Sequence, residues 1–388
     1  MSLALLLAGI LGAIFVGFNI GGSSTGIAWG PAVGAGLVKK TTAAAVMTVF
    51  VFLGGATVGR NVMDTLSSGI ITVEISLGAG VAILFFIGAG ILVANVFGVP
   101  VPTSMTTVGA IAGLGLASGT LNYETMGWIL SWWIVTPVIG FWVGAMIGRY
   151  VYPELNRRYS IQNSPGPLLV LDRRGAVPRP TFGPNTTTRE VVSTVLVLVI
   201  GCYMAFSAGA SNVPNAVAPL VSSGALDPNP AIVLATLAIA FGGFTIARRT
   251  MESVGTELSD IPLLAALIVM TTAATITTAL SWIGIPISLV MASVSTIIGL
   301  GWGRATRPVQ LRQAIRGNAD GEIATGALRS EPHSPITKIG DPEPQEVLDG
   351  RALFNPKAIF KYVSMWIIGP TLSTLLSYLF FLAVALVG

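Results

Sequence analysis

The stretch Phe206-Ser-Ala-Gly-Ala-Ser-Asn-Val-Pro-Asn-Ala-Val-Ala-Pro-Leu220 carries hydroxyl and amide side chains in the middle of an apolar region. Such side chains are costly at membrane depth, because each unsatisfied polar group costs several kcal/mol there. We expect Gly209 and Pro214 to break the helix at this point. A similar stretch, Gly17-Phe-Asn-Ile-Gly-Gly-Ser-Ser-Thr-Gly26, lies near the N-terminus. Paired interruptions in two halves of a membrane chain are typical of a transporter's binding site.

The composition of the 388 residues places the chain in a membrane. Hydrophobic residues make up 53% and charged residues only 10%, whereas soluble domains carry about 25% charged residues. The single cysteine, Cys202, excludes an internal disulfide, and the single histidine, His333, is expected to be a solvated loop residue. The N-terminus lacks the basic residues of a signal peptide, so we expect Met1 to Val16 to form part of the first membrane helix.

The apolar segments occur in the same order in both halves of the chain. Long runs are at 2–18, 41–59, 75–97 and 126–148, and again at 190–206, 231–247, 261–283 and 363–387. Each half also has a short segment that begins with Pro-x-Ser, at 101–117 and at 285–302. Their length favours re-entrant hairpins over full crossings, and the repeated order indicates an internal duplication.

The loops predict the orientation of the chain. The linker after the first half and the loop that begins at Gly303 both carry clusters of arginine, which predicts that both are cytoplasmic. The equivalent loop in the first half would then lie outside. We expect the chain to lie in the plasma membrane with both termini outside. The predicted fold is an all-α polytopic membrane protein with two inverted-topology repeats, broken helices and re-entrant hairpins. Its parts are repeat 1 (1–148), a cytoplasmic linker (149–189), the main part of repeat 2 (190–302), a polar cytoplasmic loop (303–356) and the last membrane helix (357–388).

Four of these segments carry a resemblance to a known family. Gly209-Ala-Ser-Asn-Val-Pro-Asn-Ala216, and more loosely Gly17-Phe-Asn-Ile-Gly-Gly-Ser-Ser24, resemble the two Gly-x-Asn-Asp-x-Ala-Asn-Ala motifs of the PiT-type inorganic phosphate transporters. Pro102-Thr-Ser-Met-Thr-Thr107, and more weakly Pro286-Ile-Ser-Leu-Val-Met291, resemble that family's Pro-x-Ser-Thr-Thr-His hairpin motif. The resemblance covers nearly the whole membrane portion, in order.

The motifs differ from the family's pattern at the positions of its charged residues. Ile20 and Asn212 stand where the family has aspartates, and Thr107 and Met291 stand where it has histidines. Because the resemblance ties those aspartates to sodium binding, the coupling ion stays open between sodium and proton. No other cofactor and no metal are expected.

The resemblance also predicts a substrate site made of neutral donors. An oxyanion at membrane depth needs helix N-termini and polar side chains in place of water. The expected substrate-binding residues are Asn19, Ser23, Ser24, Ser104, Thr106, Ser211, Asn212, Asn215 and Ser288. The alternative is that these side chains only link membrane helices. Asp64 and Glu252, at equivalent places in the halves, are read either as salt-linked helix ends or as an ion relay.

The predicted function is ion-coupled transport of inorganic phosphate by alternating access. Sulfate or another oxyanion is the alternative substrate, because a site that only donates hydrogen bonds suits an anion without a proton. An anion channel and a transport-inactive scaffold are further alternatives. Enzymatic chemistry is not expected, because membrane-embedded histidine, a metal cluster and a catalytic pair are all missing. The expected partners are the substrate, the lipid bilayer and a second copy in a homodimer, not a nucleic acid.

Overall fold

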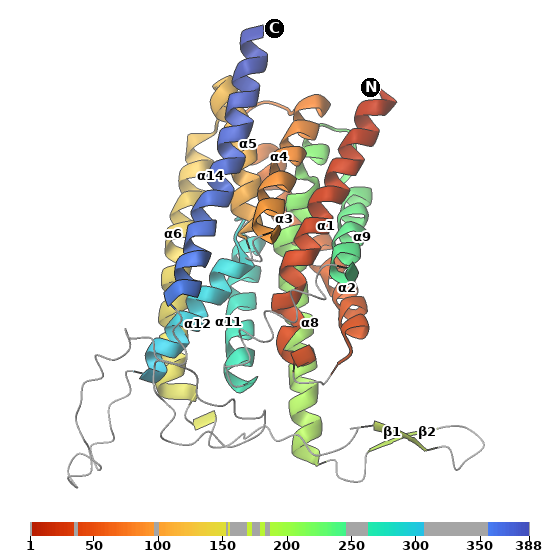
Figure 1. Ribbon diagram of the computed structural model, residues 1–388, viewed down its shortest axis with the longest axis vertical. Coiled ribbons are helices and arrows are strands. Elements are labelled where there is room, and N and C mark those ends of the chain that lie inside the picture. The colour runs from red at the N-terminus through yellow and green to blue at the C-terminus, as the bar shows by residue number, and fades with distance from the viewer. Residues whose placement is uncertain are drawn as a thin grey trace, which may run out of the picture.

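The computed structural model describes residues 2–34, 38–96, 101–152, 154–155, 169–172, 179–182, 187–245, 263–305 and 356–387. Within this part the chain is an elongated bundle of helices (Figure 1). The first half contains α1 (Leu3–Gly34), α2 (Lys40–Ala56), α3 (Gly59–Asp64), the π-helix η1 (Thr65–Gly69), α4 (Leu77–Val96), α5 (Thr103–Ser118), α6 (Tyr123–Met146) and the π-helix η2 (Ile147–Val151). The second half contains α8 (Thr188–Ser222), α9 (Pro228–Thr245), α11 (Leu263–Trp282), α12 (Leu289–Ala305) and α14 (Pro356–Val387).

The helices occupy the predicted apolar runs. Seven of the described helices are long and apolar enough to cross a membrane, and an eighth span results if the helices Thr41–Ala56 and Gly59–Gly69 count as one. These two segments meet at an angle of 60°, so the chain bends between α2 and α3, a place where no break was predicted. The short segments that begin with Pro-x-Ser form α5 and α12, as expected for the inner arms of two hairpins.

Two short strands in the linker depart from the all-helical expectation. Strand β1 (Leu169–Asp172) pairs antiparallel with β2 (Arg179–Phe182). Most of the predicted cytoplasmic loop, residues 306–355, lies outside the described residues, and so does Glu252.

The helix breaks predicted at residues 17–26 and 206–220 are wrong. The first stretch is continuous helix within α1, and the second is continuous helix within α8, which passes through Gly209 and Pro214. A proline in a helix removes one backbone hydrogen bond, and neighbouring helices can compensate for this loss in a membrane protein. Gly209 has a packing role instead, since a Cβ atom there would lie 2.1 Å from the carbonyl oxygen of Val51 on α2.

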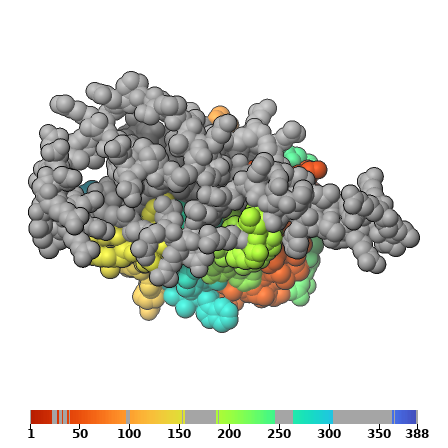
Figure 2. Space-filling view, turned by 90° about the horizontal axis from the view of Figure 1, so that it is seen from below, coloured from red at the N-terminus to blue at the C-terminus, as the bar shows by residue number. Residues whose placement is uncertain are grey.

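The two halves run through the bundle in opposite directions. In Figure 1 both chain termini lie at the top, whereas η2 and the start of α8 lie at the bottom. Figure 2, seen from below, shows the end of α6 in yellow, the start of α8 in yellow-green and α12 in cyan at this face. The opposite directions of α1 and α8 agree with an inverted repeat, which stays a prediction from the sequence.

Helices of one half pack mainly against helices of the other half. The most extensive contacts are α5 with α14, α6 with α12, α2 with α8 and α1 with α9. Glycines permit close approach in these pairs. A Cβ atom on Gly144 of α6 would lie 2.4 Å from the Thr296 carbonyl oxygen on α12, and one on Gly113 of α5 would lie 2.7 Å from the Thr374 carbonyl oxygen on α14. Each hairpin is therefore fastened to a long helix of the opposite half.

Candidate functional site

Helices α4 and α5 form the first hairpin, and α11 and α12 form the second. The two hairpins enter the bundle from opposite ends (Figure 1), and their inner ends, here called tips, meet where α5 and α12 begin. The loop before α4 and the loop after α5 are joined by hydrogen bonds from Thr72 N to Thr120 O and from Asn122 N to Ile70 O. The outer ends of α4 and α5 therefore lie together, and Figure 1 shows the outer ends of α11 and α12 toward the bottom. Ser104 at the start of α5 donates from Oγ to the carbonyl oxygen of Ile287, just before α12, at 2.9 Å.

Two asparagines of α8 bind the tip of the first hairpin. Asn215 donates from Nδ2 to Ser104 Oγ at 3.0 Å and to Thr103 Oγ1 at 3.4 Å. Thr103 donates in turn from Oγ1 to Asn212 Oδ1 at 2.6 Å. Asn212 and Asn215 lie three residues apart and so share one face of the helix. We call Thr103, Ser104, Asn212, Asn215 and the Ile287 carbonyl the tip cluster.

The tip cluster is buried and lies at the N-termini of two helices. Its four polar side chains are at most 5% exposed. Helix α5 begins at Thr103 and α12 begins at Leu289, so both positive ends of the helix dipoles lie close to this point. Neutral donors next to two helix N-termini are the arrangement that holds an anion without counter-charge. Among the described residues, no group of three His, Cys, Asp or Glu side chains could hold a metal ion.

Three predicted site hydroxyls bond within their own segments. Ser288 accepts from the backbone N of Met291 at 3.3 Å, in the first turn of α12. Thr106 donates to the carbonyl oxygen of Pro102 at 3.2 Å, and Ser211 donates to that of Ala208 at 3.3 Å. All three side chains are buried. These three residues are close to members of the tip cluster in sequence, but among the described residues none of their hydroxyls has a hydrogen bond to the cluster.

Asn19 belongs to a different polar contact. Its Nδ2 donates to Phe15 O at 2.9 Å, and Asn95 of α4 donates from Nδ2 to the Asn19 carbonyl and Oδ1 at 3.0 and 3.1 Å. No hydrogen bond in the described part joins Asn19 to the tip cluster. The backbone of Ser23 and Ser24 belongs to α1, but their side chains lie outside the described part.

Thr103 and Asn95 were not among the residues predicted from sequence. Thr103 is the middle residue of Pro102-Thr-Ser104 and starts α5, so its position directly after the proline was the available signal. Asn95 is a lone amide near the end of the apolar run 75–97. A polar side chain at membrane depth needs a partner, and that requirement could have pointed to Asn95.

The predicted relay residue Asp64 lies at the surface. It ends α3 and is exposed. Arg60, one turn earlier, donates from Nη2 to Asn229 Oδ1 at 2.5 Å, and no ion pair joins Arg60 to Asp64 in the described part. The described part of the chain therefore shows no salt link at this helix end. Its counterpart Glu252 lies outside the described residues.

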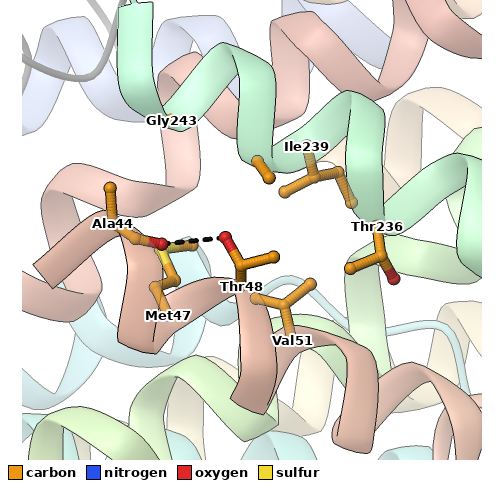
Figure 3. A pocket seen from close by; sticks show the side chains of 8 residues that line it. Ala44, Met47, Thr48, Val51, Thr236, Ile239 and Gly243 are labelled. Atoms are coloured by element: carbon orange, nitrogen blue, oxygen red, sulfur yellow. Dashed lines mark hydrogen bonds between the residues drawn. The ribbon is translucent and has the colours of Figure 1, made fainter. Parts of the chain in front are cut away.

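A small pocket between α2 and α9 has a different character. Figure 3 shows its lining of mainly apolar side chains, with Thr48 on one helix and Thr236 on the other. Thr48 donates to the carbonyl oxygen of Ala44 at 2.8 Å. The pocket offers no charged group and none of the predicted site residues, so we do not assign the substrate to it.

Comparisons with known proteins agree with this architecture. The solved structure entitled "The sodium-dependent phosphate transporter" matches with a TM-score of 0.70 and 19% identity, over 100% of both chains, which shows the shared fold. The sulfate permease CysP of Bacillus subtilis is 30% identical over 80% of this chain and 81% of its own length. The chloroplastic inorganic phosphate transporter 2-1 of Arabidopsis thaliana is 24% identical over 78% of this chain and 67% of its own length.

The family assignment rests on a match across most of the chain. The model of the phosphate transporter family, PHO4, matches residues 20–377. This range contains the tip cluster, both hairpins, α6 and most of α14. The chain therefore belongs to the phosphate transporter family.

Proposed function

We propose that this chain is an ion-coupled carrier of inorganic phosphate in the cell membrane, with the anion bound at the tip cluster. The observation that carries the proposal is the meeting of two hairpins from opposite ends around buried amide and hydroxyl donors. Ser104 joins the two tips through the Ile287 carbonyl, and Asn215 joins Ser104 to α8. Movement of either hairpin away from this point would open the cluster to one side of the bundle. This is the geometry that alternating access requires.

The proposed site residues differ in their support. Ser104, Asn212 and Asn215 are supported by their shared hydrogen bonds with Thr103. Thr106, Ser211 and Ser288 would shape the walls, and their hydroxyls would have to leave present partners in order to bind the anion. Asn19, Ser23 and Ser24 would contribute from α1. Asp64, being exposed, would act at the entrance rather than within the cluster.

The arginine-rich linker supports a cytoplasmic position for the bottom end of the bundle in Figure 1, with both termini outside. The coupling ion is proposed to be sodium or a proton, and assembly as a homodimer is part of the proposal. A saturable flux that an ion gradient drives uphill would separate a carrier from a channel.

Sulfate is the second candidate substrate. It is favoured by the Bacillus subtilis relative named as a sulfate permease and by Asn212, which stands where the family motif has an aspartate. Uptake of labelled phosphate and of labelled sulfate into proteoliposomes, with a sodium or a proton gradient imposed in turn, tests the proposal. Saturable phosphate uptake driven by one gradient is the expected result. Sulfate uptake that phosphate does not inhibit would replace phosphate with sulfate.

A further inference from the structure

The orientation of the Asn215 amide follows from its neighbours. The Ile287 carbonyl can only accept a hydrogen bond, so the hydroxyl proton of Ser104 points toward it. The Ser104 oxygen must then accept from Asn215, and only the Nδ2 atom of that amide can donate. The amide therefore turns Nδ2 toward the first hairpin and Oδ1 away from Ser104.

Asn215 Oδ1 is a buried acceptor without a donor. The residue is 0% exposed, and no group in the described part donates to this oxygen. The neighbouring acceptor, Asn212 Oδ1, already receives the Thr103 hydroxyl at 2.6 Å. Buried acceptors are nearly always paired in folded proteins. The tip cluster therefore contains an unpaired acceptor as well as donors, whereas the sequence predicted a site that only donates.

We propose that Asn215 Oδ1 accepts the hydrogen of protonated phosphate and so selects phosphate over tetrahedral anions that carry no proton. This inference rests on the proposed function, in which the tip cluster binds the anion. Hydrogen phosphate has the same shape and charge as sulfate but carries one P–OH group. A sulfate oxygen in that place would face the amide oxygen of Asn215. Both atoms can only accept, so no hydrogen bond could form between them. A site built to bond a hydroxyl rejects the analogue that lacks it.

In this proposal the amide of Asn215 accepts the phosphate hydrogen, because no carboxylate stands at position 212. The resemblance places Asn212 at a family aspartate, whose carboxylate would be an acceptor in the same cluster. Here the Oδ1 atom of Asn212 is bound to Thr103. Asn215, one helical turn further along α8, supplies the remaining acceptor.

Competition for labelled phosphate uptake tests the inference with the unmodified protein. The competitors in proteoliposomes would be arsenate, which keeps a proton, and sulfate and monofluorophosphate, which are tetrahedral dianions without one. We expect arsenate to inhibit at least about tenfold more strongly than either of the other two. Equal inhibition by all three would overturn the inference while leaving phosphate transport in place. Sulfate uptake without phosphate uptake would overturn the proposed function as well.

Two variants at the same residue sharpen the test. Asn215→Asp keeps an acceptor but loses the donor to Ser104, so uptake should fall while sulfate stays a poor competitor. Asn215→Ala removes the acceptor, so the ratio between arsenate and sulfate inhibition should fall at least about fivefold. The control Ser293→Ala removes a buried hydroxyl whose one hydrogen bond among the described residues goes to Leu289 O of its own helix, and should leave the ratio unchanged. An unchanged ratio in a folded Asn215→Ala variant would contradict the role of Oδ1.

Discussion

Helices α1 and α8 pack against the bundle in the same way. A Cβ atom on Gly21 of α1 would lie 2.0 Å from the Ile239 carbonyl oxygen on α9, and one on Gly209 of α8 would lie 2.1 Å from the Val51 carbonyl oxygen on α2. The reverse contacts repeat as well, with Gly242 against Phe18 and Gly54 against Phe206. One constant shift in residue number relates the two sets of contacts: Phe18 to Phe206, Gly21 to Gly209, Val51 to Ile239 and Gly54 to Gly242.

The polar side chains do not repeat with the packing. In α8, Asn212 and Asn215 reach the first hairpin. The same shift leads to Ser24 and Ile27 in α1, and the amide of that helix, Asn19, bonds to Asn95 of α4 instead. Close backbone contacts tolerate only glycine, so they constrain both copies alike. The polar residues are free to differ, and among the described side chains the hydrogen bonds to the first hairpin come from Asn212 and Asn215 of α8.

The largest expected effect concerns the shared packing. Gly209→Val and Gly21→Val each place side-chain atoms against a backbone carbonyl that cannot move without shifting a helix. We expect each to destabilise the fold by about 3 kcal/mol or more, with loss of the monodisperse peak after detergent extraction. Gly127→Val is the matched control, because no atom lies within 4 Å of a Cβ atom there. Damage from only one of the two substitutions would show that the helices do not pack equivalently.

The second prediction concerns the chemistry of α8. Thr103→Val removes the hydroxyl that donates to Asn212 and accepts from Asn215, at almost unchanged volume. Leaving a buried partner unsatisfied costs about 1–3 kcal/mol, so the initial rate of phosphate uptake should fall about tenfold. In the described part of the chain the Thr271 hydroxyl on α11 bonds to Leu267 O alone, so Thr271→Val should keep the rate of the unmodified protein. Equal rates for the two variants would remove Thr103 from the site.

Much of the fold could be predicted from the apolar runs and from the two segments that start with Pro-x-Ser. Pro102 and Pro286 each precede a short helix, and the serine two residues later lies at each tip. A proline suits the start of a helix because its missing N–H has no partner there in any case. The hairpins could therefore be placed from local signals alone.

The continuity of α1 and α8 could not be predicted, because it depends on neighbours. Gly209 and Pro214 are helix breakers in water, but here Gly209 packs against Val51 of α2. The sequence also did not show which glycine of α1 is equivalent to Gly209 of α8. The motif match pairs Gly17 with Gly209, whereas the packing pairs Gly21 with Gly209, one helical turn away. A sequence with glycines at both positions cannot show which one meets a carbonyl.

The third prediction is that Asn19 of α1 stabilises the fold through its contact with Asn95 and does not bind the substrate. Asn95→Ala removes the donor that binds both the carbonyl and Oδ1 of Asn19. We expect the thermal midpoint to fall by a few degrees, from about 1 kcal/mol of lost stability, and phosphate uptake to fall less than in Thr103→Val. Leu92→Ala, at an exposed position of the same helix, is the control. A larger loss of uptake than in Thr103→Val would place the Asn19–Asn95 contact within the substrate site.

The smallest expected effect lies where α2 meets α9. Thr48 and Thr236 are related by the same shift and line the same pocket (Figure 3), but only Thr48 has a described hydrogen bond, to Ala44 O at 2.8 Å. The Thr236 hydroxyl is buried without a partner in the described part. Thr48→Val should therefore lower stability by about 0.5 kcal/mol, while Thr236→Val should be neutral or stabilising by a similar amount, because it removes an unsatisfied group. Thermal unfolding of both variants in detergent measures the difference. Equal destabilisation would mean that Thr236 is paired in the membrane and that the two copies are more alike than their hydrogen bonds indicate.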